Sequence, residues 1–299
     1  MSTLKDVAKK SGLSLTTVAT ILRGEKDLYQ SETIRRVEEA AASLGYVPNH
    51  FSRNLVKGKT GILLYALSLR GGATFNRESE LSLAEATAKS SFKLLIEPVD
   101  ESGRPPEDAG FLNGRYFDGV IANFTSWTPE DMDRVEKNLE RAGIPLVWFN
   151  QEREVNAVYP DEKADAVSLA RFLFQKKYRS LLYVGHAPVH HHFSSRERYH
   201  SFQSEWSRLG GAFREVIAPL NPDISKSHEN WKQNLAALKD VSAAFDCAVF
   251  SHAFLAPLFL SLTQAKLPLF SFDVPAPSWG SLAIGGQRIP WEELGRASV

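Results

Sequence analysis

The 299-residue sequence contains a single cysteine, Cys247, so an intrachain disulfide is impossible. This scarcity fits a reducing compartment, in which thiols stay reduced. No apolar run approaches the roughly 18 residues of a candidate membrane span. The N-terminal segment MSTLKDVAKK also lacks the apolar core of a secretory signal. We therefore expect a soluble, cytoplasmic protein.

The sequence also lacks a net charge, because 35 Lys and Arg residues balance 35 Asp and Glu residues. The charge is unevenly distributed, however. Residues 1–59 hold ten Lys/Arg and six Asp/Glu, whereas the rest of the chain holds 25 and 29. A basic N-terminal segment on an acidic body indicates that the segment binds a polyanion such as nucleic acid.

Signatures of catalysis are absent as well. The sequence has no Gly-rich phosphate loop, no nucleophile elbow and no cluster of metal ligands with a known spacing. Five of the eight histidines lie between His186 and His200, but histidines alone at these spacings do not form a known metal pattern. A loop at the edge of a cleft, or a pH-sensitive loop, is the alternative explanation. We expect no enzyme activity, no cofactor and no metal.

Residues 3–45 repeat apolar side chains at helical spacing. We expect one helix that ends at Gly12, a second capped by Ser14 and a third from Ser31 to Gly45. Two short helices joined by a Gly-containing turn, followed by a third, are typical of a helix-turn-helix domain. The outer face of the second helix carries small uncharged side chains, so it can lie close to base edges. An ordinary three-helix packing unit is the alternative.

From Thr60 onward, short apolar runs alternate with helical stretches. The runs are ILLYAL, FKLLIEPV, DGVIANF, PLVWFN, SLLYVG, DCAVFS and LPLFSFD. This alternation predicts an α/β fold with parallel sheets that are covered on both faces. Seven runs are enough for two sheets, and we expect two lobes. The predicted domains are a helix-turn-helix domain at 1–46, a basic connector with a brief helix at 47–59, and a two-lobed body at 60–299.

The segments TLKDVAKKSGLSLTTVATILRG and SETIRRVEEAAASLGYVPNHFSRNLVKGKTG resemble the DNA-binding head and hinge of the LacI/GalR family. The resemblance covers residues 3–61 without a gap. It implies that Leu15, Thr16 and Thr20 read bases, and that Ser14 and Thr17 contact phosphates.

The resemblance also implies a hinge helix from Asn49 to Lys57 that folds in the minor groove of DNA. Leu55 would be the wedge between base pairs, and packing of Leu55 on the body is the alternative. The other DNA-contacting positions that the resemblance implies are Leu4, Arg23, Tyr46, Asn49 and Ser52.

Three positions of the head depart from the family pattern. Thr20 stands where the family most often has Arg, and Arg23 stands where it often has Asn. Because a bidentate Arg contact to guanine is lost, the preferred operator should differ from the common half-site. Gln30 replaces the usual Ser, so we expect Ser31 to cap the third helix one residue later.

A weaker resemblance from residue 61 to 299 implies a two-lobed, periplasmic-binding-protein-like effector domain with ligand between the lobes. Arg198 in SSRERYHSF would bind hydroxyls or a carboxylate, and a solvated helix charge is the alternative. Asp273 at the end of LPLFSFD would accept hydrogen bonds from sugar hydroxyls or cap the following turn. Trp231 would stack on ligand or belong to the core. Phe75 and Asn150 complete the expected effector-binding set.

Two features of the body depart from the family pattern. His252 and Ala253 stand where the family typically has an Asn-Asp pair, so a ligand-binding carboxylate is missing. Either the effector differs from the usual sugars or the pocket has weakened. The segment PWEELGRASV resembles the start of a family helix that normally continues, whereas this sequence stops at Val299. This short end places stability and dimerisation in question.

These patterns predict a homodimeric, sequence-specific transcriptional regulator that acts as a repressor on a pseudo-palindromic double-stranded DNA operator. A small-molecule effector such as a sugar, bound between the lobes, would modulate the affinity for DNA. Two alternatives remain: a DNA-binding regulator that has lost its effector response, and a small-molecule-binding protein without a role on DNA.

Overall fold

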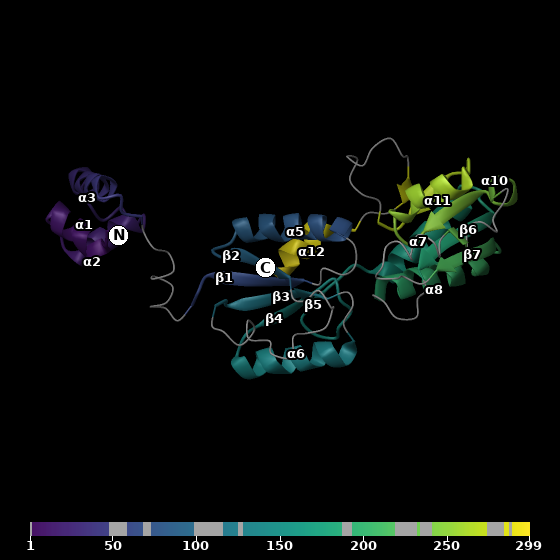
Figure 1. The fold of residues 1–299 in the computed structure, drawn as a ribbon, viewed down its shortest axis with the longest axis horizontal. Helices are drawn as coiled ribbons and strands as arrows, with labels where there is room; N and C mark the ends of the chain where they lie inside the picture. Colours follow the sequence, from purple (N-terminus) through teal and green to yellow (C-terminus); the bar gives the residue numbers. More distant parts are fainter. Residues whose placement is uncertain are drawn as a thin grey trace. The chain divides into compact units, whose positions relative to one another are not determined.

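The computed structural model describes residues 2–47, 59–67, 73–98, 116–124, 128–186, 193–218, 232–233, 241–273, 284–286 and 289–299. The chain divides into two compact units, Met1–Thr60 and Gly61–Val299, and each is described by itself (Figure 1). The expected hinge helix from Asn49 to Lys57 lies outside the described residues, as do residues 190–192. Within the described ranges, no helix is both long and apolar enough to cross a membrane.

The N-terminal unit consists of α1 (Leu4–Ser11), α2 (Leu15–Leu22) and α3 (Ser31–Ser43). Thr3 and Asp6 form a reciprocal capping box at the start of α1: the Asp6 amide donates to Thr3 Oγ1 at 3.3 Å, and the Thr3 amide donates to Asp6 Oδ2 at 2.8 Å. These bonds satisfy backbone N–H groups that a helix start leaves open. Gly12 then ends α1 with a φ of 67°, a left-handed conformation that glycine adopts without strain.

The caps of the next two helices differ. Ser14 caps α2 as predicted, because its hydroxyl accepts a hydrogen bond from the Thr17 amide at 3.1 Å. The prediction that Ser31 caps α3 is wrong. Gln30 has the extended backbone of the N-cap position, with no side-chain hydrogen bond there, and Ser31 is already the first helical residue. A cap needs the side chain of the extended residue, so Ser31 sits one position too late.

The three helices enclose a small apolar core, and the predicted three-helix arrangement is confirmed. Leu4 and Tyr46 pack half-buried against this core. The core residues come from all three helices: Val7, Ala8, Val18, Ile21, Val37, Ala40 and Ala41.

The first lobe of the second unit is built on a five-stranded parallel sheet of order β2-β1-β3-β4-β5. Its elements are β1 (Ile62–Leu67), α5 (Ala73–Ala88), β2 (Lys93–Pro98), β3 (Gly119–Asn123), α6 (Pro129–Ala142), β4 (Leu146–Phe149) and β5 (Ala157–Val158). Alternate residues of β1 point to opposite faces, since Leu64 packs with α6 residues whereas Tyr65 packs with Leu83 of α5. Figure 1 shows α5 on one face of the sheet and α6 on the other.

The second lobe is built on another parallel sheet, of order β10-β9-β8-β6-β7. Its elements are α7 (Glu162–Gln175), β6 (Ser180–His186), α8 (Phe193–Arg208), β7 (Ala212–Ala218), α10 (Val241–Ala244), β8 (Cys247–Phe250), α11 (Leu255–Thr263), β9 (Leu269–Ser271) and β10 (Gly285–Gly286). Tyr183 of β6 packs with residues of α7 and α8, whereas its neighbour Leu182 packs with α11. Both predicted sheets are therefore present, and helices cover both of their faces.

The last helix, α12 (Trp291–Ser298), returns to the first lobe and packs against α5 (Figure 1). Leu294 is buried with Tyr65 and Phe149 in the apolar cluster on that face of the sheet. A Cβ atom at Gly295 would lie 2.8 Å from backbone atoms of Ser82, so the two helices meet closely at this glycine. The C-terminal segment is thus part of the core of the first lobe.

Candidate functional site

The start of α2 presents the surface expected to contact DNA. Ser14, Leu15 and Thr16 are exposed, and Leu15 retains 43% of its surface. The Ser14 hydroxyl accepts from the Thr17 amide and lies 2.9 Å from the Thr17 hydroxyl. Thr17 is half-buried, so this pair of hydroxyls fixes the first turn while the neighbouring side chains remain accessible. Such a turn can place an apolar side chain and hydroxyls against base edges and phosphates.

Further along α2, Thr20 differs from the expectation of an open hydroxyl on the outer face. It is only 8% exposed, and its Oγ1 accepts a hydrogen bond of 2.7 Å from Nη2 of Arg23. Arg23 also donates from Nε to the Ala19 carbonyl oxygen at 3.1 Å, and Nε lies 3.7 Å from a carboxylate oxygen of Glu25. The exposed guanidinium of Arg23 therefore covers the Thr20 hydroxyl, so the two expected DNA-contacting side chains bond to each other.

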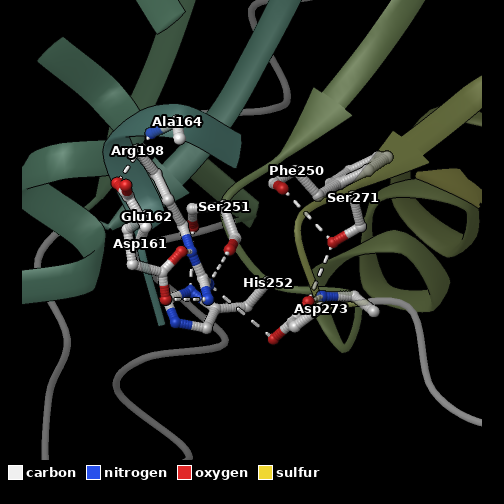
Figure 2. A network of polar contacts seen from close by, with 10 residues as sticks. Asp161, Glu162, Ala164, Arg198, Phe250, Ser251, His252, Ser271 and Asp273 are labelled. Atoms are coloured by element: carbon white, nitrogen blue, oxygen red, sulfur yellow. Dashed lines mark hydrogen bonds and ion pairs between the residues drawn. The ribbon is translucent and has the colours of Figure 1, made fainter. Parts of the chain in front are cut away.

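A second set of polar side chains gathers at the carboxyl ends of strands in the second lobe, and Figure 2 shows it from close by. At its centre is Arg198 of α8, which is 1% exposed. Its Nε donates to Glu162 Oε2 at 2.6 Å, its Nη2 donates to Glu162 Oε1 at 2.7 Å, and its Nη1 donates to the Ser251 carbonyl oxygen at 2.7 Å. The alternative of a solvated helix charge at Arg198 is therefore wrong.

Glu162 is the partner that sequence reasoning missed. It is the first residue of α7, directly after the N-cap Asp161, whose Oδ1 accepts from the Ala164 amide at 2.9 Å. The helix dipole favours a carboxylate in the first turn of a helix. In the sequence, Glu162 therefore looks like an ordinary exposed acidic residue at a helix start. Glu162 is only 3% exposed, however, and it meets Arg198 from 36 residues away. Burial by itself lowers the pKa of Arg198, but the charge and hydrogen bonds of Glu162 raise it overall.

Asp273 lies on the other side of the guanidinium, in the segment that follows β9 (Figure 2). Its Oδ1 accepts from the Ala253 amide at 2.6 Å and from Ser271 Oγ at 2.9 Å. Its Oδ2 is buried, 4.0 Å from Arg198 Nη1, and has no hydrogen-bond donor among the described residues. Burial raises the pKa of Asp273, and the charge of Arg198 opposes that shift. Asp273 therefore caps the turn before α11 with one oxygen and keeps the other as an unused acceptor.

Of the other expected effector-binding residues, only Asn150 has a side chain within the described part of the structure. Asn150 follows β4 in the first lobe, with a φ of 56° and its amide bonded to the Val158 carbonyl oxygen at 2.7 Å. Phe75 belongs to α5, but its side chain is outside the described part of the structure. Trp231 lies outside the described residues, as do Asn49, Ser52 and Leu55 of the expected hinge.

The first lobe has its own buried polar groups at the carboxyl ends of its strands, which the sequence did not single out. Asn123 ends β3, and its Nδ2 donates to the Tyr65 hydroxyl at 3.0 Å. Asn123 Oδ1 and Gln151 Nε2 are buried without a partner among the described residues. Parallel α/β sheets bind ligands at this end of their strands. Unused polar atoms there are what a ligand site requires.

A hollow of about 310 Å³ lies beside the Arg198–Glu162 pair. The aromatic rings of Tyr159 and Phe193 line it, edge to face at 5.3 Å. Lys163 lines it as well. The remaining charged side chains that line it are all acidic: Glu152, Asp161, Glu162 and Glu197. Within the described ranges, no group of three or more His, Cys, Asp or Glu side chains could hold a metal ion.

Comparisons with known proteins agree with this architecture. The model of a family described as "Bacterial regulatory proteins, lacI family" matches residues 3–49. The HTH-type transcriptional regulator PtxS of Pseudomonas putida is 30% identical over 229 residues, which cover 72% of this chain and 62% of that protein. The chain thus spans less than two thirds of the length of this relative.

Solved structures share the fold. The lac repressor dimer bound to operator and the anti-inducer ONPF has a TM-score of 0.77 at 16% identity, and the match covers 99% of this chain and 90% of that chain. The Cra regulator of Pseudomonas putida in complex with fructose 1-phosphate has a TM-score of 0.61 at 18% identity, covering 80% of this chain and 89% of that chain. Because the family model matches its head and a relative is 30% identical over 72% of its length, the chain belongs to the lacI family of bacterial regulatory proteins.

Proposed function

We propose that this protein is a sequence-specific, DNA-binding transcriptional repressor that acts as a homodimer in the cytoplasm and has no enzymatic activity. The observation that carries the proposal is the exposed first turn of α2 within a three-helix head that matches the family model. The basic charge of residues 1–59 supports it, because phosphate contacts supply much of the affinity for DNA. The proposed division is a DNA-binding head at 1–46, a hinge at 47–59 and an effector-binding and dimerisation body at 60–299.

In this proposal α2 lies in the major groove. Leu15 and Thr16 face base edges, while the hydroxyls of Ser14 and Thr17 face the phosphate backbone. Arg23 places its guanidinium over Thr20 and supplies a cation at the end of the same face. Tyr46 and Leu4 contact the backbone from the edge of the head, and Asn49, Ser52 and Leu55 act in the minor groove.

Two copies of the head on a two-fold axis read a pseudo-palindromic operator, and an effector in the body shifts the affinity for it. The effector is a small polar molecule such as a sugar, held by Arg198 and Asp273 from the second lobe and by Phe75, Asn150 and Trp231. Support comes from the unused Asp273 Oδ2 and from the family, in which the lac repressor and Cra structures contain small-molecule ligands.

The experiment that tests the proposal is selection of bound duplexes from a random library with the purified full chain at fixed, near-physiological salt. A recovered palindrome with a deformable central pyrimidine–purine step is expected. Leu15→Ala and Thr16→Ala should weaken binding to that palindrome, each by about fivefold to a hundredfold. Leu28→Ala is the matched control, because Leu28 is 81% exposed but lies outside α2. Recovery of no preferred sequence, or equal effects of Leu15→Ala and Leu28→Ala, contradicts the proposal.

A regulator that has lost its effector response is the second candidate, and the contact of Arg198 with Glu162 favours it. In that case operator affinity stays constant when sugars, sugar phosphates and organic acids are added one at a time. A ligand that changes operator affinity excludes this candidate, because only differential binding to two states can shift the equilibrium.

A further inference from the structure

The proposed function does not explain why the guanidinium of Arg198 already donates hydrogen bonds to other groups of the same protein. A guanidinium has five N–H donors in a planar fork. Two of them form a bidentate contact with Glu162, and a third is donated to the Ser251 carbonyl oxygen. The fork edge that recognises a carboxylate or a phosphate is therefore occupied by a side chain of the same protein.

This contact differs from the surface ion pairs of the same lobe. The side chains of Arg198 and Glu162 are 2% and 3% exposed, whereas Arg208 and Arg171, which both contact Glu205, are 62% and 57% exposed. Water screens exposed pairs strongly, but it cannot screen or compete for a buried pair. The Glu162 carboxylate thus remains on the Arg198 guanidinium unless another anion takes its place.

The charges around this contact also disfavour an incoming anion. Glu162 neutralises Arg198, and the Asp273 carboxylate lies 4.0 Å from Nη1 on the other side. The adjoining hollow is lined by Glu152, Asp161, Glu162 and Glu197, with Lys163 as the cation among its lining residues, while Arg196 contacts Glu152 and Glu197. A ligand with a carboxylate or phosphate would meet like charges here.

The hydrogen bonds that remain are suited to uncharged hydroxyl groups. Two N–H groups of the Arg198 fork are left after its three described bonds, and Asp273 Oδ2 is an acceptor with no donor among the described residues. A hydroxyl can accept from the first and donate to the second, whereas an anion can only accept.

We propose that Glu162 determines the ligand class of the candidate effector site: its carboxylate acts as an internal ligand of Arg198, so that the site takes uncharged polyhydroxyl compounds and rejects carboxylates and phosphates. The inference rests on the proposed function in placing the effector at Arg198 and Asp273. It goes beyond that function because it assigns selectivity to a residue of α7 that contributes no free group to the ligand.

Chemical rescue tests the internal ligand directly. Glu162→Ala leaves a carboxylate-sized space against the buried guanidinium, so the thermal midpoint of the body should fall and acetate should raise it again. All six tryptophans lie in the unit Gly61–Val299, so tryptophan fluorescence follows the body without a contribution from the head. Potassium acetate is compared with potassium chloride at equal ionic strength, which cancels general screening.

We expect acetate to raise the midpoint of Glu162→Ala by several degrees more than chloride does, and to leave the wild-type chain unchanged. Glu205→Ala is the matched control, because it removes a carboxylate from arginines that are already solvated. It should show no acetate-specific rise. An equal acetate effect on all three proteins, or none on a folded Glu162→Ala, overturns the inference.

Glu162→Gln provides a second variant if Glu162→Ala does not fold, since it keeps the shape of the side chain and removes its charge. Calorimetry with inorganic phosphate as the probe should show binding to Glu162→Gln about tenfold tighter than to the wild-type chain. Equal phosphate affinity for the two proteins overturns the inference. Failure of the proposed function is recognised separately, because the operator selection uses the wild-type chain and does not depend on Glu162.

Discussion

Replacing Arg198 by Met should destabilise the body strongly at neutral pH, because the change leaves Glu162 buried with a charge and no counterion. Glu162 is 3% exposed, and the nearby Asp273 carboxylate is buried as well. Removing one partner of a buried ion pair typically costs about 3–5 kcal/mol. For a unit of this size, each 1 kcal/mol lowers Tm by roughly 2–4 °C. The expected fall in Tm is therefore on the order of 6–20 °C.

The pH dependence of this loss identifies its cause. Burial raises the pKa of Asp273 and the charge of Arg198 opposes that shift, so without Arg198 the folded variant binds the Asp273 proton more tightly than the unfolded chain does. The stability linked to this proton is fully present below the unfolded pKa of Asp273 and is lost as the pH rises. The difference in Tm between the wild-type chain and Arg198→Met should accordingly shrink when the pH is lowered from 7 to 5.

The assay is thermal unfolding followed by tryptophan fluorescence at both pH values. Arg171→Met is the control, since Arg171 is 57% exposed and its contact with Glu205 should contribute less than about 1 kcal/mol. The double variant Glu162→Leu/Arg198→Met should recover most of the lost stability, because apolar side chains of similar volume replace both charges. A Tm of Arg198→Met within 2 °C of the wild-type value, or a difference that does not change with pH, would refute the reasoning.

Three further predictions concern single side chains. Ser14→Ala should lower the free energy of unfolding of the head by about 1 kcal/mol, and Ser14→Gly by about a few tenths of that, because glycine is tolerated at the N-cap of α2 and alanine is not. Thermal unfolding of the two variants measures the difference, and equal losses of stability would contradict the capping role of Ser14. Burial raises the pKa of Asp273, so its contribution to stability is fully present below the unfolded value of 3.8 and is lost as the pH rises. Asp273→Asn should therefore unfold at a midpoint no lower than the wild-type value at pH 7, while losing any ligand-induced change in operator affinity. Arg208 and Arg171 lower the pKa of Glu205 to about 2, so its contribution is present above pH 4.5 and is lost as the pH falls toward 2. Thermal unfolding followed by tryptophan fluorescence, to which the buried Trp206 contributes, should show a smaller loss of stability between pH 4.5 and pH 2 in Glu205→Gln than in the wild-type chain. An equal loss in the two proteins would exclude Glu205 as its source.

Local patterns were sufficient for most secondary structure. All seven apolar runs became strands, because buried parallel strands need continuous apolar side chains and that requirement is visible in the sequence. The strand β7 was missed, since Arg214 and Glu215 interrupt its apolar pattern. This strand lies at the edge of its sheet, where polar side chains can point to water. The two-residue strands β5 and β10 were missed because they are too short to form a pattern.

The sequence by itself determined the helix-turn-helix head and the alternation of strands and helices, because caps, turns and periodicity act between residues that are close along the chain. Only the tertiary structure decided what the functional side chains meet. Arg198 was singled out as a ligand-binding residue, yet its partner Glu162 lies 36 residues away and carries the signal of an ordinary first-turn acid. Thr20 was expected to be open, but Arg23 turns back along α2 onto its hydroxyl. The type of a residue determines which hydrogen bonds and ion pairs its side chain can form. Burial and contacts with elements that are distant along the chain determine which of these interactions are formed in the folded protein.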